Sequence, residues 1–169
     1  PTHVEVEGVR YDLVEVLKHD SWAATAIYES AEEKIICKFN RQQRIGLLPM
    51  RWLGRRLANR ENYLLRRLAD LPNIPSHRGP VTVDGVPQSH VASHVFVEGH
   101  PLHQGDATSD TFFQELRDTL EVMHSRGIAY VDLHKAENIL VGDDGRSYLI
   151  DFQVCFIRPR NRLLAAIMS

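Results

Sequence analysis

The feature that most constrains this chain is a short hairpin sequence that ends in an acidic residue. Residues 139–141 and 148–150 are apolar, β-prone runs, and the stretch Gly-Asp-Asp-Gly at 142–145 lies between them. Glycine and aspartate favour tight turns, so the pattern predicts two antiparallel strands joined by a turn. Asn138 directly precedes the first strand and Asp151 directly follows the second. The predicted ribbon therefore brings these two oxygen-bearing side chains to the same end.

The order of side chains around this ribbon resembles that of the protein-kinase family. Kinases carry an Asp in a loop, an Asn at the start of an apolar strand, and an Asp-Phe pair after the next strand. Here Asp132, Asn138 and the pair Asp151-Phe152 occupy those places. The resemblance implies that Asp132 is the catalytic base and that Asn138 and Asp151 bind Mg²⁺ beside ATP. Each residue alone would more often cap a turn, so the combination carries this interpretation.

The rest of the chain predicts strands and two helices. The β-prone runs expected as strands are residues 11–17, 23–28, 34–39, 81–86 (a hairpin around Asp84-Gly85) and 90–97. Leucines recur at helical spacing from Met50 to Leu71. A second amphipathic helix is expected to begin at Asp110 or Thr111 and to end at Gly127. A short helix is expected at 161–168.

Two residues of the first half are candidate partners for the phosphates of ATP. Lys38 ends an apolar strand, where a lysine is costly unless it is paired. Glu61 lies on the long helix, and no other acidic residue occurs between Asn40 and Ala69. The resemblance implies a Lys38–Glu61 ion pair that positions the α- and β-phosphates. The alternatives are a solvated strand end and an exposed helix charge.

Several positions depart from the kinase pattern. The first hairpin, where kinases carry a glycine-rich loop, lacks glycine, and Ser21 with its small neighbours is expected to substitute in part. The residue directly before Asp132 is not an arginine, as it is in many kinases. This argues against control of activity by phosphorylation of an activation loop. Five residues separate Asp132 from Asn138, against four in the common motif, and Lys135 is expected to act as the catalytic-loop lysine. Gln153 replaces the glycine that usually follows Asp-Phe.

The resemblance is closest to two small bacterial groups, the lipopolysaccharide core kinases and the RIO-type kinases. It implies an α+β, bilobal protein-kinase-like fold. The expected parts are an antiparallel-sheet N-lobe with one long helix at 1–97, a hinge at 98–103 and an abbreviated, mainly helical C-lobe at 104–169. At the hinge, the backbone of Glu98 is expected to hydrogen-bond the adenine ring of ATP.

Charge and cysteine content narrow the compartment and the partners. The formal net charge is −2, so no global charge points to nucleic acid, and we expect none as a partner. No apolar run approaches the roughly 18 residues that span a bilayer. The two cysteines, Cys37 and Cys155, lie in apolar runs and are expected to be buried free thiols. These features favour a reducing, cytoplasmic compartment.

The long helix and the segment before it are rich in arginine. The arginines are Arg41, Arg44, Arg51, Arg55, Arg56, Arg60, Arg66 and Arg67. Leu48, Met50 and Trp52 lie among them. Arginine beside an aromatic anchor suits an anionic membrane surface or a phosphorylated glycan, which would place the protein at the inner membrane face. A solvated helix face is the alternative.

These observations predict an ATP- and Mg²⁺-dependent kinase that phosphorylates a hydroxyl acceptor, either a protein Ser/Thr or a membrane-associated glycan. The alternative is a pseudokinase or a nucleotide-binding scaffold at an anionic membrane surface. His90 and His94 have the spacing of metal ligands on a helix, but their segment is strand-like, which argues against a metal site. His100 and His103 are expected to be surface residues.

Overall fold

The computed structural model describes residues 1–44 and 49–159 and has an α+β fold. The chain divides into two compact units, Pro1–Val97 and Glu98–Ser169, and each is described by itself. The assignment of these units to kinase lobes, with a hinge at 98–103, stays a prediction. Leu48 and the helix expected at 161–168 lie outside the described residues.

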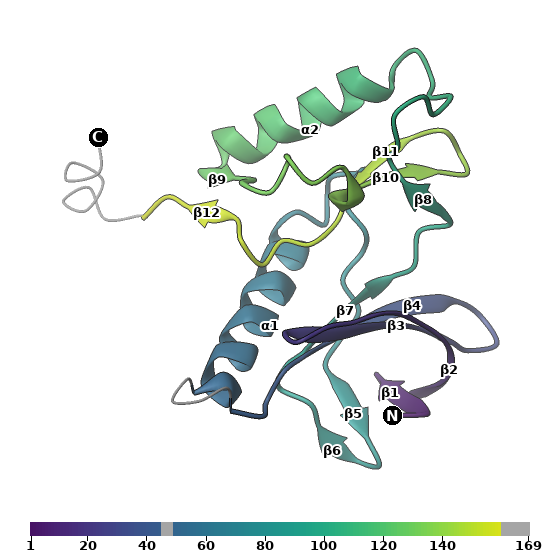
Figure 1. The fold of residues 1–169 in the computed structure, drawn as a ribbon, viewed down its shortest axis with the longest axis vertical. Helices are drawn as coiled ribbons and strands as arrows, with labels where there is room; N and C mark the ends of the chain where they lie inside the picture. The colour runs from purple at the N-terminus through teal and green to yellow at the C-terminus, as the bar shows by residue number, and fades with distance from the viewer. Residues whose placement is uncertain (45–48, 160–169) are drawn as a thin grey trace. The chain divides into compact units, whose positions relative to one another are not determined.

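The first unit is built on a single antiparallel sheet. Its strands are β1 (His3–Val6), β2 (Val9–His19), β3 (Ala23–Glu29), β4 (Lys34–Asn40), β5 (Val81–Val83), β6 (Val86–Pro87) and β7 (Val91–Val95). The sheet is curled and has the order β6-β5-β1-β2-β3-β4-β7 (Figure 1). The predicted Asp84-Gly85 turn is confirmed, since both residues have the positive φ that a tight hairpin needs.

Alternation along the strands places one set of side chains in the core of the first unit. The buried set is Val4, Val6, Tyr11, Ala26, Tyr28, Ile35, Cys37, Val81 and Val91. Cys37 is fully buried, as expected for a structural thiol, and burial raises its pKa to about 12. Cys155 is also buried, and like Cys37 it is not in a disulfide. Both thiols are therefore unreactive by position.

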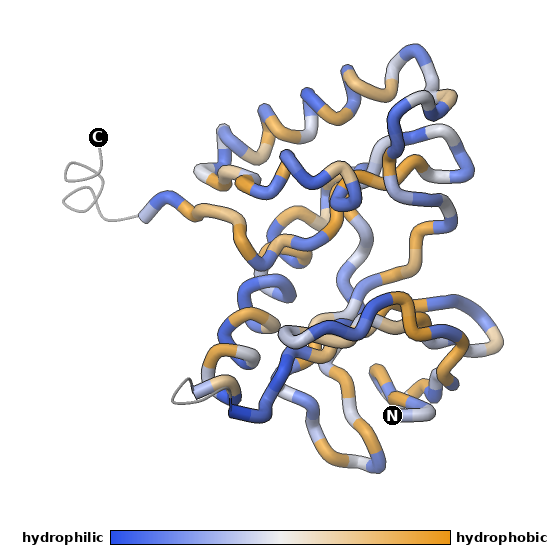
Figure 2. The backbone as a smooth tube through the Cα atoms, viewed as in Figure 1, coloured by the Kyte–Doolittle hydropathy of each residue, from blue (hydrophilic) through white to orange (hydrophobic). Residues whose placement is uncertain are grey.

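Helix α1 (Met50–Arg67) covers part of this sheet and packs against β4 and β7. Its buried positions, which include Gly54, Ala58 and Glu61, recur every three or four residues, and apolar and polar residues alternate along the helix (Figure 2). Gly54 permits close packing, because a Cβ there would lie 2.7 Å from the carbonyl oxygen of Arg41. The helix ends at Arg67, with Leu68 as its C-cap, and so stops short of the predicted Leu71.

The second unit has one long helix and short strands. Its elements are β8 (Gly99–Pro101), α2 (Phe112–Ser125), β9 (Ile128–Ala129), the 3-10 helix η1 (Ala136–Asn138), β10 (Ile139–Gly142), β11 (Ser147–Leu149) and β12 (Phe156–Ile157). They form two small sheets, β11-β10-β8 and β12-β9. Helix α2 buries Phe112, Leu116 and Met123, and begins after Thr111, one of the two predicted caps. Gly127 ends it with a φ of 73°.

The second unit contains more strand than an abbreviated, mainly helical C-lobe was expected to have. Strand β7 ends at Val95, and Gly99–Pro101, inside the predicted hinge, forms a separate short strand, β8, that pairs with β10. Glycine is required there, because a Cβ at Gly99 would lie 2.2 Å from the carbonyl oxygen of Val141. A mainly helical C-lobe is not confirmed, since the described part of this unit contains one α-helix and five short strands.

Candidate active site

The loop that carries Asp132 joins β9 to β10 and is closed by its own backbone. The N–H of Lys135 donates to the carbonyl oxygen of Asp132 at 3.2 Å, and the N–H of Asn138 donates to that of Lys135 at 3.0 Å. These two turns accommodate the five residues between Asp132 and Asn138. The loop thus reaches the start of β10 with Asp132 and Asn138 side by side.

The carboxylate of Asp132 is buried and has cationic and amide partners. Its Oδ2 lies 2.7 Å from Nζ of Lys135, and its Oδ1 lies 3.6 Å from Nδ1 of His134. The amide nitrogen of Asn138 donates to the carbonyl oxygen of Asp132 at 3.2 Å. The hydrogen bond from Lys135 is the main cause that lowers the pKa of Asp132. Asp132 is therefore ionised at neutral pH.

Asp151 follows β11 in a backbone conformation that side chains rarely adopt. Its φ is 59°, a left-handed value that Asp tolerates better than most residues do. The hydroxyl of Tyr130 donates to the carbonyl oxygen of Ile150, and the N–H of Ile150 donates to that of Asn138 at 3.1 Å. These bonds hold the residue before Asp151 against both ends of the Asp132 loop. Strain of this kind is common at functional sites.

Two ladders close the second unit around this loop. The predicted hairpin is present, with Ile139 opposite Leu149. After Asp151 the chain returns, and β12 pairs with β9 just before the loop. Asp132, Lys135 and Asn138 are thereby brought together. Asp132 is the largest cause that raises the pKa of Lys135. The negative charge of Asp151 lies near enough to make a smaller contribution in the same direction.

Lys38 and Glu61 come together within the first unit. Lys38 is on β4 and Glu61 is on α1, and Nζ lies 3.9 Å from Oε2. The carboxylate of Glu61 is almost fully buried, whereas Lys38 keeps some exposure. Asn62, next to Glu61, fixes the helix to the edge strand because its amide donates to the carbonyl oxygen of Val91 at 3.0 Å. This bond to β7 helps to fix the helix face on which Glu61 meets Lys38.

The loop between β2 and β3 contains the predicted phosphate-binding residue Ser21, which is exposed. Its neighbour Asp20 organises the turn, because Oδ1 accepts the N–H groups of Trp22 at 2.8 Å and of Ala23 at 2.9 Å. Both bonds lower the pKa of Asp20, and the bond from Ala23 has the larger effect. A phosphate at these two N–H groups would have to displace an anionic side chain.

Glu98, the predicted adenine contact, is exposed and opens the second unit. Its carbonyl oxygen accepts the N–H of Asp143 at 2.9 Å. The backbone carbonyl group of Glu98 is therefore already hydrogen-bonded within the second unit.

The arginine-rich face of α1 points away from Glu61. Arg51, Arg55 and Arg56 are exposed, and so is Trp52, whose side chain lies 5.4 Å from the guanidinium of Arg56. Met50, in contrast, is buried and does not contribute to that surface.

Sequence reasoning missed several residues that shape these sites. Tyr130 lies where kinases carry histidine, and besides its bond to Ile150 its ring packs edge-on against Phe152 at 5.7 Å. The position was visible in the sequence, but its bond was not. Asp20, which organises the β2–β3 turn, was not among the candidate site residues. His100 and His103 are exposed as expected, yet they lie with Asp106 in a group that the sequence analysis did not recognise.

Comparison with known proteins gives a partial match. No protein-family model matches this sequence. The chain is similar to the serine/threonine-protein kinase WAG1 of Arabidopsis thaliana, with 35% identity over 98 residues, which cover 53% of this chain and 20% of the plant protein. The chain thus spans about a fifth of the length of this relative. The similarity supports a kinase-like relationship, and the closer resemblance to lipopolysaccharide or RIO-type kinases stays a prediction.

Within residues 1–44 and 49–159, no helix is long and apolar enough to cross a membrane.

Proposed function

We propose that this chain is an ATP-dependent kinase that transfers the γ-phosphoryl group to a hydroxyl acceptor. The arrangement in the second unit carries the proposal: a buried, ionised Asp132 bonded to Lys135, with Asn138 beside it and Asp151 at a left-handed elbow. The name of the plant relative favours a protein serine or threonine as acceptor. A membrane-associated glycan, as in the lipopolysaccharide core kinases, is the other candidate.

Each side chain has a distinct task in this reaction. Asp132 orients the acceptor hydroxyl and takes its proton as the oxygen attacks the γ-phosphorus. The bond to ADP breaks on the opposite side, and Lys135 offers a positive charge to the transferring group. Because Lys135 also holds Asp132 ionised, one ion pair supplies both the base and its orientation.

The donor set around the ribbon fits Mg²⁺. The amide nitrogen of Asn138 donates to Asp132, which leaves its amide oxygen as the atom to face a cation. Asp151 adds a carboxylate, and both are the hard oxygen ligands that this ion takes. When bound, the ion would neutralise charge on the phosphate oxygens.

ATP turnover measured with and without Mg²⁺ tests the proposal. We expect turnover with the ion and none above background when it is chelated. Absence of turnover with a panel of protein and glycan acceptors, despite tight ATP binding, would instead support a scaffold.

The pair formed by Lys38 and Glu61 should act as a unit that positions the α- and β-phosphates. We expect Lys38→Met and Glu61→Gln to lower turnover comparably, and the double variant to be little worse than either one, because partners in one pair are not additive. Steady-state kinetics of the three variants provide the measurement. Lys34→Met, a half-buried lysine on the same strand, is the matched control. Fully additive losses would contradict the pairing.

A nucleotide-binding scaffold without transfer is the second candidate. The β2–β3 loop favours it, since Asp20 takes the N–H groups of Trp22 and Ala23 that a glycine-rich loop would offer to phosphate. An anionic side chain at this place opposes a phosphate through both charge and occupancy of the donors.

The inhibitory effect of Asp20 can be measured directly. We expect Asp20→Asn to tighten ATP binding roughly five-fold at low salt, because one repulsive charge is removed while an acceptor for the turn remains. The gain should shrink as salt rises. Isothermal titration with Asp12→Asn, an exposed aspartate on β2, the strand that leads into this loop, gives the control. Unchanged affinity for Asp20→Asn would remove the loop from the nucleotide site.

The exposed arginines of α1 supply a proposed docking surface for an anionic membrane or a phosphorylated glycan. Arg51, Arg55 and Arg56 project outward beside Trp52. Each arginine close to an anionic bilayer contributes about 1 kcal/mol. The enzyme would then work at the inner membrane face, near a membrane-associated acceptor.

Liposome co-sedimentation tests this surface. Wild type should prefer anionic over neutral vesicles at low salt and lose the preference at high salt. The triple change Arg51, Arg55 and Arg56 to Gln should abolish it. A triple change of the exposed Arg10, Arg117 and Arg158 to Gln removes the same charge elsewhere and should not. An equal loss of binding to anionic vesicles in both variants would show that net charge, and not this surface, causes the binding.

A further inference from the structure

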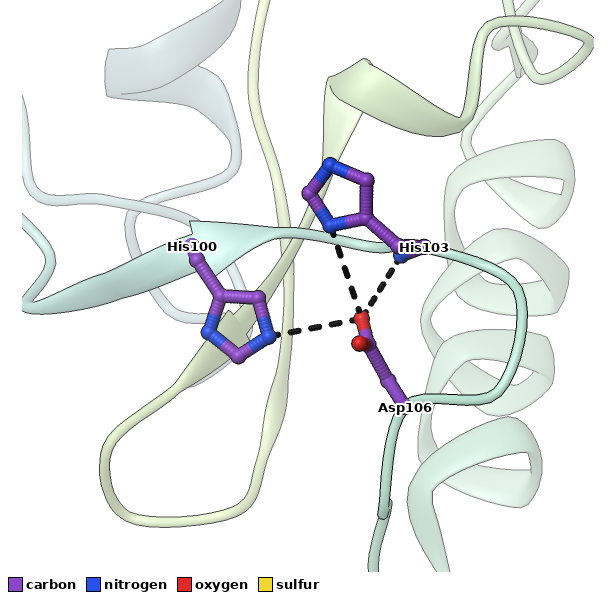
Figure 3. Close-up of side chains that lie close together, drawn as sticks. All are labelled: His100, His103 and Asp106. Carbon is purple, nitrogen blue, oxygen red and sulfur yellow. Dashed lines mark hydrogen bonds and ion pairs between the residues drawn. The ribbon is translucent and has the colours of Figure 1, made fainter.

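Three side chains that play no part in the proposed kinase chemistry converge in the second unit. His100, His103 and Asp106 point toward one another (Figure 3). Oδ2 of Asp106 lies 3.3 Å from Nε2 of His100 and 3.8 Å from Nδ1 of His103. One ligand atom from each residue can be chosen so that all three lie within 4.8 Å of one another.

The backbone fixes the positions of these residues. His100 is in the middle of β8, opposite Val141 of β10. The chain then turns, with the N–H of Asp106 donating to the carbonyl oxygen of His103 at 3.3 Å and Gly105 at a φ of 92°. The N–H of His103 in turn donates to Oδ2 of Asp106 at 2.6 Å. A strand and a closed turn therefore fix the backbone positions from which the three side chains approach one another.

The separations suit a small divalent ion. Zinc binds imidazole nitrogen and carboxylate oxygen at about 2.0–2.2 Å, so neighbouring ligand atoms of a tetrahedral site lie about 3.3 Å apart. Of the three separations, one has this value, the second, 3.8 Å, needs a small rotation of the His103 ring, and the third, between the two imidazole nitrogens, lies within 4.8 Å. The N–H of His103 orients the carboxylate in the way that outer hydrogen bonds support metal ligands.

We propose that His100, His103 and Asp106 bind a zinc-type transition-metal ion. Two imidazoles and one carboxylate suit zinc and its first-row neighbours, whereas Mg²⁺ takes oxygen ligands. The site is therefore chemically distinct from the pair Asn138 and Asp151. Both histidines are exposed, and three protein ligands leave the fourth position open to water or another donor.

The electrostatics of the cluster agree with this assignment. The backbone N–H of His103 is the largest cause that lowers the pKa of Asp106. The carboxylate is thus ionised and ready to bind a cation. A bound ion would also tie β8 to the turn that follows it, and so stiffen the segment 100–106. This inference does not depend on the kinase proposal.

Isothermal titration of the full, tag-free chain with Zn²⁺ is the direct experiment. We expect one equivalent to bind, and Co²⁺ to give the intense visible absorption of a four-coordinate site. His100→Gln, His103→Gln and Asp106→Asn should each weaken Zn²⁺ binding by at least about ten-fold, which is the smallest loss typical of disturbing even an outer metal partner. Millimolar Mg²⁺ should not compete.

The control removes an exposed histidine elsewhere in the same unit. His124→Gln, in the last turn of α2, should bind Zn²⁺ like wild type. Zn²⁺ should also raise the melting temperature of wild type and of His124→Gln, but not that of the cluster variants. Circular dichroism without metal checks that the cluster variants are folded. Wild type without stoichiometric binding, or folded cluster variants that bind as tightly as wild type, would overturn the proposal.

Discussion

Replacement of Asp132 by Asn is expected to lower turnover by at least about 10²-fold, while ATP affinity stays nearly unchanged. Asparagine keeps the shape of the side chain and can still accept a hydrogen bond from Lys135. It cannot take the proton of the acceptor hydroxyl at neutral pH. Single-turnover kinetics measure the rate of transfer, and equilibrium titration measures the ATP affinity. The two experiments separate an effect on catalysis from an effect on binding. Turnover equal to that of wild type would exclude Asp132 as the base.

The control for this change is an aspartate outside the loop. Asp118 is exposed on α2, where its carboxylate accepts a hydrogen bond from Gln114, and Asp118→Asn should leave turnover as in wild type. Lys135→Ala gives a second check. Since Lys135 lowers the pKa of Asp132, its removal should raise that pKa toward the ordinary aspartate value of about 3.9. Carboxyl NMR titration of both proteins measures the shift.

Local sequence patterns were sufficient where a turn or a helical period dictates the structure. The strand–Gly-Asp-Asp-Gly–strand pattern correctly predicted that Asn138 and Asp151 lie at one end of a ribbon, because register follows from the turn. The spacing of leucines likewise predicted α1. These predictions needed no knowledge of distant contacts.

Features that depend on distant partners were missed. Strand β12 has only two residues and is formed because β9, almost thirty positions earlier, offers its edge. No period can be read from so short a run. Two side-chain contacts were missed for the same reason: the hydrogen bond from Tyr130 to Ile150, and the approach of Asp106 to His100. Each depends on how its own loop folds and cannot be read from the spacing of residues in the sequence. The same holds for β8, whose pairing with β10 was hidden by a Gly-His-Pro sequence that is typical of a loop.

The second large expected effect concerns Asp151. We expect Asp151→Asn to reduce the gain in ATP affinity that Mg²⁺ provides by at least about ten-fold, since loss of an inner ligand should exceed that of an outer partner. Asparagine tolerates the left-handed backbone at this position, so the loss cannot be assigned to strain. Asn138→Ala should have a smaller effect on binding, because an amide oxygen holds a hard cation less strongly than a carboxylate does. ATP titrations with and without Mg²⁺ give the ratio for each protein.

Asn138→Asp separates the two roles that the structure gives to Asn138. The substitution keeps an oxygen ligand and adds charge, so Mg²⁺-dependent affinity should be retained or increased. It also removes the N–H donor to the carbonyl of Asp132 and places two carboxylates together, because the amide nitrogen of Asn138 lies 3.5 Å from Oδ2 of Asp132. Repulsion should raise the pKa of this coupled pair and lower turnover. An Asn138→Asp variant that loses metal-dependent binding while Asp151→Asn keeps it would place the ion elsewhere in the protein.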